Sequence, residues 1–214
     1  MQSKQEGRDS MVQTAGILLA GGRSTRMGSM KALLQIGDKT AAGHVLQTLQ
    51  DTTEKQICIA NEPDALSFLP VRVTVDLRPH EGPLAGIETG METVDASYYV
   101  TAACDMPLID PRILQWMIHQ AAEKQADILL PHIDGRDQPL CAVYSRSTLP
   151  AVKASLDAGI RAVKPLFDQM HTVRISESEL EQAGCTNDSI KRSFFNMNRP
   201  EEYEEMQTYW RERG

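Results

Sequence analysis

Strand-like and helix-like segments alternate over residues 14–125, and this alternation limits the fold more than any other feature of the sequence. Apolar runs predict strands at 14–19, 56–60, 71–75 and 97–103, and helix-period patterns predict helices at 41–50, 83–94 and 111–125. Strands that alternate with helices form βαβ units, in which the strands lie parallel and the helices cover both faces of the sheet. We therefore predict a three-layer α/β fold with a Rossmann-like, mainly parallel sheet.

The second half of the chain predicts a change of strand direction. Strands are expected at 128–130 and 140–144, and the turn between them contains Asp134-Gly135, a pair that favours tight turns. We therefore expect an antiparallel strand in this half. Helices are predicted at 147–158 and 163–169, a strand at 172–175, and a final helix after Arg199-Pro200.

The composition disfavours several classes of protein. The net charge is -7 and aromatic residues make up 5% of the chain, whereas nucleic-acid binders usually present a basic surface or aromatic stacking platforms. No apolar run is long enough to span a membrane, and the polar segment 1–10 lacks the apolar centre of a signal peptide. The four cysteines have neither zinc nor thioredoxin spacing, so we expect buried free thiols. These features predict a cytoplasmic protein that binds neither nucleic acid nor membranes.

The most informative segment is LLAGGRSTRMGSMKALL, residues 18–34, which follows the first predicted strand. Its glycines let backbone N–H groups approach a ligand closely, and its three cations repel one another unless an anion lies among them. These residues are Gly21, Gly22, Arg23, Arg26, Gly28 and Lys31. The segment matches neither the P-loop pattern, because Ser29 follows Gly28, nor the G-x-G-x-x-G pattern. We interpret it as a phosphate site rather than a solvated basic loop.

Two aspartates follow predicted strands. Asp105 comes after the strand at 97–103, so its carboxylate should lie at the carboxyl edge of the sheet, where it would suit Mg²⁺. The alternative is that Asp105 caps a helix, but Asp110 is better placed to cap the helix that starts at Pro111. Asp76 follows the strand at 71–75, and for it a simple turn residue stays an open alternative.

Four segments together resemble a known family. The loop LAGGRSTRMGSMKALL resembles the signature loop of nucleotidyltransferases with a Rossmann-like sheet. The other segments are DLRPHEGPLAGI at 76–87, CDMP at 104–107 and FFNMNRPEEY at 194–203. With these segments, the chain resembles molybdenum cofactor guanylyltransferases of the MobA type over about residues 14–208.

The resemblance implies transfer of GMP from GTP to molybdopterin, or Mo-molybdopterin, with release of pyrophosphate and with Mg²⁺ as the metal. It implies that Arg26, Lys31 and Asp105 act in catalysis and that Asp105 holds the metal. The implied nucleotide-binding positions are Leu19, Ala20, Gly21, Gly22, Arg23, Lys31, Asn61, Asp76, Gly82 and Asp105. Proteins that deliver the molybdenum cofactor would be further partners.

The acceptor is expected opposite the nucleotide. Amide and carboxylate side chains suit the edges of a pterin, and arginine suits a terminal phosphate. The acceptor-binding candidates are Arg136, Asp137, Gln138, Arg161, Asn196 and Asn198. The chain departs from the family at two positions: Leu140 stands where a threonine is common, and Met30 stands where an aspartate is frequent.

We expect residues 1–12 to be a disordered lead-in and residues 13–214 to form a single nucleotidyltransferase domain. Its nucleotide-binding half would span about 13–110 and its acceptor-binding half about 111–214. His80 lies between two motifs and is expected to be an exposed loop residue.

Other functions stay open at the level of the sequence. Cytidylyl transfer to molybdopterin, or nucleotidyl transfer to a sugar phosphate, would reuse the first loop, because base recognition often uses backbone groups that residue identities do not reveal. A non-catalytic nucleotide-binding adaptor in cofactor insertion would keep the loop without needing Asp105.

Overall fold

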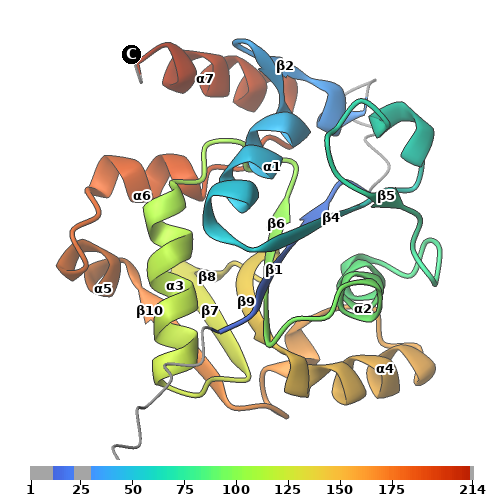
Figure 1. Cartoon of the computed structure of the whole chain (residues 1–214). Helices are drawn as coiled ribbons and strands as arrows, with labels where there is room; N and C mark the ends of the chain where they lie inside the picture. Colours follow the sequence, from blue (N-terminus) through green and yellow to red (C-terminus); the bar gives the residue numbers. More distant parts are fainter. Residues whose placement is uncertain (1–11, 22–29, 213–214) are drawn as a thin grey trace, which may run out of the picture.

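An eight-stranded sheet lies between two layers of helices in the computed structural model, which describes residues 12–21 and 30–212 (Figure 1). The strand order is β10-β7-β9-β6-β1-β4-β5, and β8 pairs with β7. The strands are β1 (Thr14–Leu19), β4 (Lys55–Ile59), β5 (Val73–Thr74), β6 (Tyr98–Ala103), β7 (Ile128–Ile133), β8 (Arg136–Asp137), β9 (Cys141–Ser145) and β10 (Thr172–Ser176). The predicted α/β architecture is confirmed.

Four neighbouring strands, β5, β4, β1 and β6, run parallel, as the alternation of strands and helices predicts. All six residues of β1 are buried, because helices cover both faces of the sheet at its centre. The register pairs Leu19 with both Ile59 and Ala103, and it pairs Ile59 with Thr74. The carboxyl ends of these four strands therefore lie in one row.

The predicted antiparallel strand is β9, which lies between β6 and β7 and runs opposite to both. The turn at Asp134 and Gly135 is present, and its two residues have left-handed φ values of 49° and 71°. It leads from β7 into the short strand β8, which the sequence does not predict, and β9 follows afterwards.

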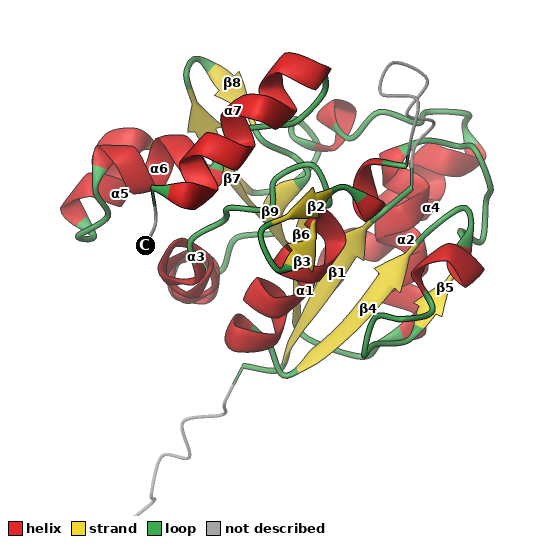
Figure 2. Cartoon of the chain, turned by 90° about the horizontal axis from the view of Figure 1, so that it is seen from above, coloured by secondary structure: helices red, strands yellow, loops and turns green. Residues whose placement is uncertain are grey.

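The helices form two layers around the sheet (Figures 1 and 2). On one face, α1 (Ala41–Thr52), α3 (Pro111–Glu123), α5 (Glu177–Gln182) and α6 (Asn187–Ser193) share a core with Leu18 of β1. On the other face, α2 (Pro83–Thr93) and α4 (Leu149–Asp157) share a core with Ile17. Successive side chains of a strand point to opposite faces, so β1 contributes to both cores.

The C-terminal helix α7 (Pro200–Arg211) packs against a small hairpin of β2 (Gln35–Ile36) and β3 (Lys39–Thr40) (Figure 2). A separate apolar cluster joins them, consisting of Ile36, Ala41, Leu108, Met197 and Met206. The sequence predicts α7, but it does not predict the hairpin or the short helices α5 and α6. Helix α7 thus covers the hairpin that follows the first loop.

The prediction of a helix at 163–169 is wrong. The structure has a single 3₁₀ turn there, η4 (Lys164–Leu166). Val163, Leu166 and Phe167 are buried in the core beside α2 and α4, and this burial explains their helix-like spacing. One turn is enough to bury three side chains, and helix formation gains little over so short a segment.

Two expectations from composition have structural counterparts. Cys58, Cys104, Cys141 and Cys185 are all buried and free, as predicted. Among the helices of residues 12–21 and 30–212, none has the length and apolar character needed to cross a membrane.

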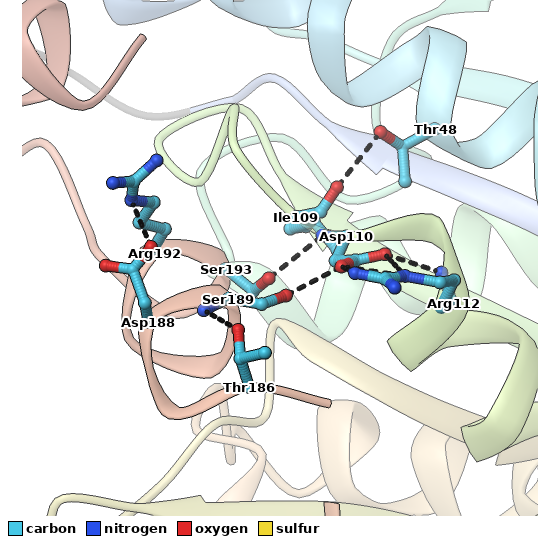
Figure 3. Close-up of polar contacts among 9 residues, drawn as sticks. All are labelled: Thr48, Ile109, Asp110, Arg112, Thr186, Asp188, Ser189, Arg192 and Ser193. Atoms are coloured by element: carbon cyan, nitrogen blue, oxygen red, sulfur yellow. Dashed lines mark hydrogen bonds and ion pairs between the residues drawn. The ribbon is translucent and has the colours of Figure 1, made fainter. Parts of the chain in front are cut away.

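Asp110 joins the loop after β6 to both α3 and α6 (Figure 3). Its carboxylate caps α3 by accepting from the backbone N–H of Arg112 at 2.9 Å, as predicted, and it also accepts from the Arg112 guanidinium at 2.6 Å. The hydroxyl of Ser189 on α6 donates to the same carboxylate at 2.6 Å, and the backbone N–H of Asp110 donates to the buried Ser193 hydroxyl at 2.9 Å. These contacts hold the loop at 104–110 between two helices.

Stability at acid pH should depend on Asp110. Burial raises the pKa of this carboxyl, but hydrogen bonds from Arg112 and Ser189 outweigh burial and lower it from 3.8 to about 2. The stabilisation is therefore fully present above about pH 4 and is lost as the pH falls toward 2. We expect Asp110→Asn to remove this part of the pH dependence, measured as the free energy of unfolding in urea between pH 2.5 and 6. Asp64→Asn, at an exposed aspartate, is the control; a constant difference between wild type and Asp110→Asn over that range would contradict the account.

Candidate active site

Four residues follow the four parallel strands at the same distance. Gly21, Asn61, Asp76 and Asp105 each lie two residues beyond the last residue of β1, β4, β5 and β6, respectively. Because the ends of these strands are aligned, the four residues meet at the carboxyl edge of the sheet. All four line one cavity of about 700 Å³, a volume within the usual range for small-molecule sites.

The main chain at the start of the first loop is held firmly between the neighbouring strands. The backbone N–H of Ala20 donates to the carbonyl of Ile59 at 2.8 Å, and the backbone N–H of Cys104 donates to the carbonyl of Leu19 at 3.0 Å. Leu19 and Ala20 both line the cavity, and Leu140 of the second half lines it as well. The main chain beside the first strand is therefore held in place up to Ala20.

Lys31 and Asp105 form an ion pair in this cavity. Lys31 begins the 3₁₀ turn η1 (Lys31–Leu33), and its Nζ lies 3.3 Å from Oδ2 of Asp105. The two side chains are 18% and 21% exposed, so both charges are partly removed from water. Burial raises the pKa of Asp105, and the Lys31 ammonium opposes part of that rise. The pair gives the cavity a cation that suits phosphate and an anion that suits a metal ion.

The loop that carries Asp76 is fastened to α2. The backbone N–H of Leu77 donates to the Thr89 hydroxyl at 2.9 Å, and Arg78 donates two hydrogen bonds to Glu88 at 2.9 and 3.2 Å. Glu88 is 3% exposed, and a carboxylate so deeply buried depends on such a bidentate partner. These contacts fix the loop after β5 against the helix.

One carboxylate oxygen of Asp76 is buried without a hydrogen bond. Its Oδ1 accepts none from the part of the chain that the structure describes. Burial raises the pKa of Asp76 to about 6, although the charge of His80 and the hydroxyl of Thr89 oppose the rise. Buried polar atoms are normally satisfied, so this unpaired oxygen makes the charged form of Asp76 unfavourable in the folded protein.

Glycine is needed twice where α2 begins. Gly82 precedes the helix with a left-handed φ of 79°, and the carbonyl oxygen of Arg161 lies 3.2 Å from the place of an added Cβ. At Gly86, an added Cβ would come within 2.8 Å of Leu19. Both glycines line the cavity. The close packing brings the N-terminus of α2, the positive end of its dipole, to the edge of the cavity, which favours an anionic ligand.

The oxygen donors of the cavity fit magnesium. No three histidine, cysteine, aspartate or glutamate residues in the described ranges gather into a cluster that could enclose a metal ion. The carboxylate of Asp105 lines the cavity beside the Lys31 ammonium. Mg²⁺ typically binds one or two carboxylates and completes its shell with water and substrate phosphates.

Cys104 lines the cavity, but its buried thiol is poorly suited to act as a nucleophile. Burial raises the pKa of its thiol to about 12, so the reactive thiolate is not formed at neutral pH.

Every predicted nucleotide position that the structure describes lines the cavity. These residues are Leu19, Ala20, Gly21, Lys31, Asn61, Asp76, Gly82 and Asp105. Gly22, Arg23 and Arg26 lie outside the described residues, and their contribution stays a prediction.

The predicted acceptor positions are more dispersed, and the cavity lining in the described ranges includes none of them. Arg136, Asp137 and Gln138 lie at or beside β8. Asp137 accepts from His132 at 2.8 Å and from Arg174 at 3.2 Å, so its carboxylate already joins neighbouring strands.

The other three acceptor candidates lie outside β8. Arg161 is exposed and packs its main chain against Gly82. Asn196 donates to the carbonyl of Phe194 at 3.1 Å. Asn198 accepts a hydrogen bond from Lys31 Nζ at 2.7 Å.

Sequence reasoning missed part of the site. His80 is exposed, as expected, but it also lines the cavity, with a left-handed φ of 66°. Its place between Asp76 and Gly82 is the signal that could have identified it. The contact between Asn198 and Lys31 spans 167 residues, and no local pattern reveals such a pairing.

Comparison with known proteins decides the family. The family model of the MobA-like NTP transferase domain matches residues 16–173. The chain belongs to this family. It is therefore a nucleotidyltransferase, and the row of strand-end residues described above lies within the matched segment.

Two relatives of this MobA-like transferase match over most of their length. One, from Pelotomaculum thermopropionicum, is named as a probable molybdenum cofactor guanylyltransferase; it is 33% identical over 190 residues, which cover 89% of this chain and 90% of that protein. The molybdenum cofactor guanylyltransferase of Desulfosudis oleivorans is 32% identical over 196 residues, with coverage of 91% and 94%.

A solved structure shares the fold. Molybdopterin-guanine dinucleotide biosynthesis protein A from Archaeoglobus fulgidus superposes with a TM-score of 0.80, covering 92% of this chain and 99% of that one, at 22% identity. The MobA-like transferase thus has the fold of that protein over nearly all of its length.

Replacing Asp76 should stabilise the MobA-like transferase at neutral pH. The folded-state pKa of about 6 lies above the ordinary value of 3.8, so the folded protein disfavours the charged carboxylate. The free energy of unfolding therefore falls as the pH rises from about 4 to 6, and the loss is complete above pH 6.

We therefore expect Asp76→Asn to gain stability relative to wild type across that interval, measured by urea unfolding at pH 4, 5, 6 and 7.5. Asp95→Asn, at an exposed aspartate near the amino end of β6, serves as the control. A stability difference that does not change with pH would show that Asp76 is not held in an unfavourable environment.

Proposed function

We propose that this MobA-like transferase moves the GMP group of GTP onto molybdopterin, or Mo-molybdopterin, and releases pyrophosphate. The observation that carries the proposal is the Lys31–Asp105 pair, which sets a cation and a carboxylate side by side in a cavity of about 700 Å³. The names of the relatives from Pelotomaculum thermopropionicum and Desulfosudis oleivorans support guanylyl transfer to the molybdenum cofactor.

The reaction needs no protein nucleophile. An oxygen of the acceptor's terminal phosphate forms a bond to the α-phosphorus of GTP, and the bond from that phosphorus to the bridging oxygen breaks. The bonding electrons leave with pyrophosphate. Positioning and charge neutralisation account for most catalysis of this kind.

Different residues would bind the phosphates and the metal. Leu19, Ala20 and Gly21 present rigid main chain to the nucleotide, and Lys31 neutralises charge on the triphosphate. Asp105 would hold Mg²⁺, which would supply Lewis-acid stabilisation of the phosphates. Arg23 and Arg26 would add further cations from the first loop.

Lys31 and the metal depend on each other through Asp105. In the free protein Lys31 offsets the partly buried charge of Asp105. A divalent ion on Asp105 would repel the nearby ammonium unless anionic phosphate oxygens lay between them. The geometry therefore favours joint binding of metal and triphosphate over binding of either alone.

The acceptor would approach from the second half of the chain. Arg161, which packs beside Gly82, is the candidate for its terminal phosphate, and the edge of the cavity at Leu140 is where its pterin would lie. This arrangement assigns the nucleotide to the half at about 13–110 and the acceptor to the half at about 111–214 of one domain. We place the reaction in the cytoplasm, and cofactor-delivery proteins would receive the product.

The test is pyrophosphate release by the purified protein with molybdopterin, GTP and Mg²⁺. We expect release with GTP, little with CTP, and none when EDTA removes the metal. Preference for CTP would favour cytidylyl transfer, and release with a sugar phosphate in place of molybdopterin would favour that acceptor. No release with any substrate would leave a non-catalytic adaptor as the better account.

The carboxylate of Asp105 should be essential for turnover. Asp105→Asn keeps the shape of the side chain but removes the charge that would hold the metal, so kcat should fall at least about 100-fold. Asp95→Asn, near the opposite end of the same strand, should keep wild-type turnover. Near-normal turnover in Asp105→Asn would remove Asp105 from the mechanism.

A further inference from the structure

The C-terminal segment contacts both members of the Lys31–Asp105 pair. Lys31 Nζ donates to Asn198 Oδ1 at 2.7 Å, a shorter contact than its 3.3 Å approach to Asp105. One residue earlier, the backbone N–H of Met197 donates to the carbonyl of Asp105 at 2.9 Å. A single turn of chain thus bridges the two charged residues of the site.

This turn is itself held in place. The carboxylate of Glu202 accepts from the backbone N–H groups of Asn198 and Arg199, the latter at 2.9 Å, and so closes the turn against the start of α7. Met197 is fully buried in the apolar cluster with Met206 of α7. The side chain of Asn198 therefore projects from a fixed main chain rather than from a loose terminus.

Helix α7 also forms hydrogen bonds with the chain that follows Lys31. The hydroxyl of Tyr203 and the amide of Gln207 both donate to the carbonyl of Gln35, at 2.6 and 2.7 Å. Gln35 begins β2, two residues after the end of the 3₁₀ turn that carries Lys31. The first residue of that turn is thus held through its side chain by Asn198, and its exit is held by α7.

We infer that Asn198 is a positioning residue for Lys31, and that this C-terminal turn belongs to the triphosphate site rather than to the acceptor pocket. Asn198 accepts a hydrogen bond without carrying charge, so it orients the ammonium and leaves its positive charge available for phosphate. An aspartate in its place would neutralise Lys31 and repel the ligand. The inference rests on the proposed function, because it assumes that Lys31 binds the triphosphate.

The direct test is GTP binding by the full chain, measured by calorimetry with Mg²⁺. Asn198→Ala should weaken GTP binding about tenfold, the size expected for losing one hydrogen bond to a charged group, and should leave the KM for molybdopterin unchanged. Asn198→Asp keeps the shape but adds a negative charge, so it should also weaken GTP binding. Asn187→Ala, at an exposed asparagine on α6, is the matched control.

A double-mutant cycle distinguishes positioning from an independent role. If Asn198 acts through Lys31, then Asn198→Ala should have no further effect on GTP affinity in a Lys31→Met background. Asn198 is exposed, so neither Asn198→Ala nor Asn198→Asp removes core packing. Thermal melting of these variants alongside Asn187→Ala checks that the fold is retained.

The outcomes separate this inference from the proposed function. Wild type that fails to bind GTP with Mg²⁺ contradicts the proposed function, and the inference with it. Wild type that binds GTP, together with unchanged affinity in Asn198→Ala, overturns the inference alone. An increase in the molybdopterin KM without loss of GTP affinity also overturns it, because it assigns Asn198 to the acceptor.

Discussion

The ion pair between Lys31 and Asp105 is the interaction on which the site depends. Each charge is partly withdrawn from water, and each therefore needs the other in the absence of ligand. A polyphosphate with a divalent ion supplies both kinds of partner at once, an anion for the ammonium and a cation for the carboxylate. The charges of Lys31 and Asp105 in the cavity thus match the chemistry of nucleotidyl transfer.

The fold brings this pair together through two different constraints. Parallel pairing aligns the ends of β1, β4, β5 and β6, so that residues two positions beyond each strand meet at one edge. Lys31 has no such strand to position it; it lies on a single 3₁₀ turn. The loop after β6 is held against α3 and α6 through Asp110 (Figure 3). The chain that follows Lys31 is held by α7. Helices from the end of the chain thereby stabilise geometry near its beginning.

The sequence predicts those parts of the site that follow from local periodicity. Buried runs locate the parallel strands, and the residues that follow them are therefore expected together, as with Asn61, Asp76 and Asp105. It fails where the cause is long-range. The contact from Asn198 to Lys31 crosses 167 residues, and the apolar spacing at 163–169 reflects burial of one turn rather than a helix. The positive φ of His80 is likewise a property of the folded loop, and no pattern of residue types predicts it.

The most direct measurement is a crystal structure of the chain with Mg²⁺ and a GTP analogue that resists transfer. The account predicts that the triphosphate lies in the strand-end cavity, with its anionic oxygens contacting both the Lys31 ammonium and an ion held by Asp105. A triphosphate bound elsewhere, or a cavity in which Lys31 stays paired with Asp105 while the phosphates point away from both, would contradict it.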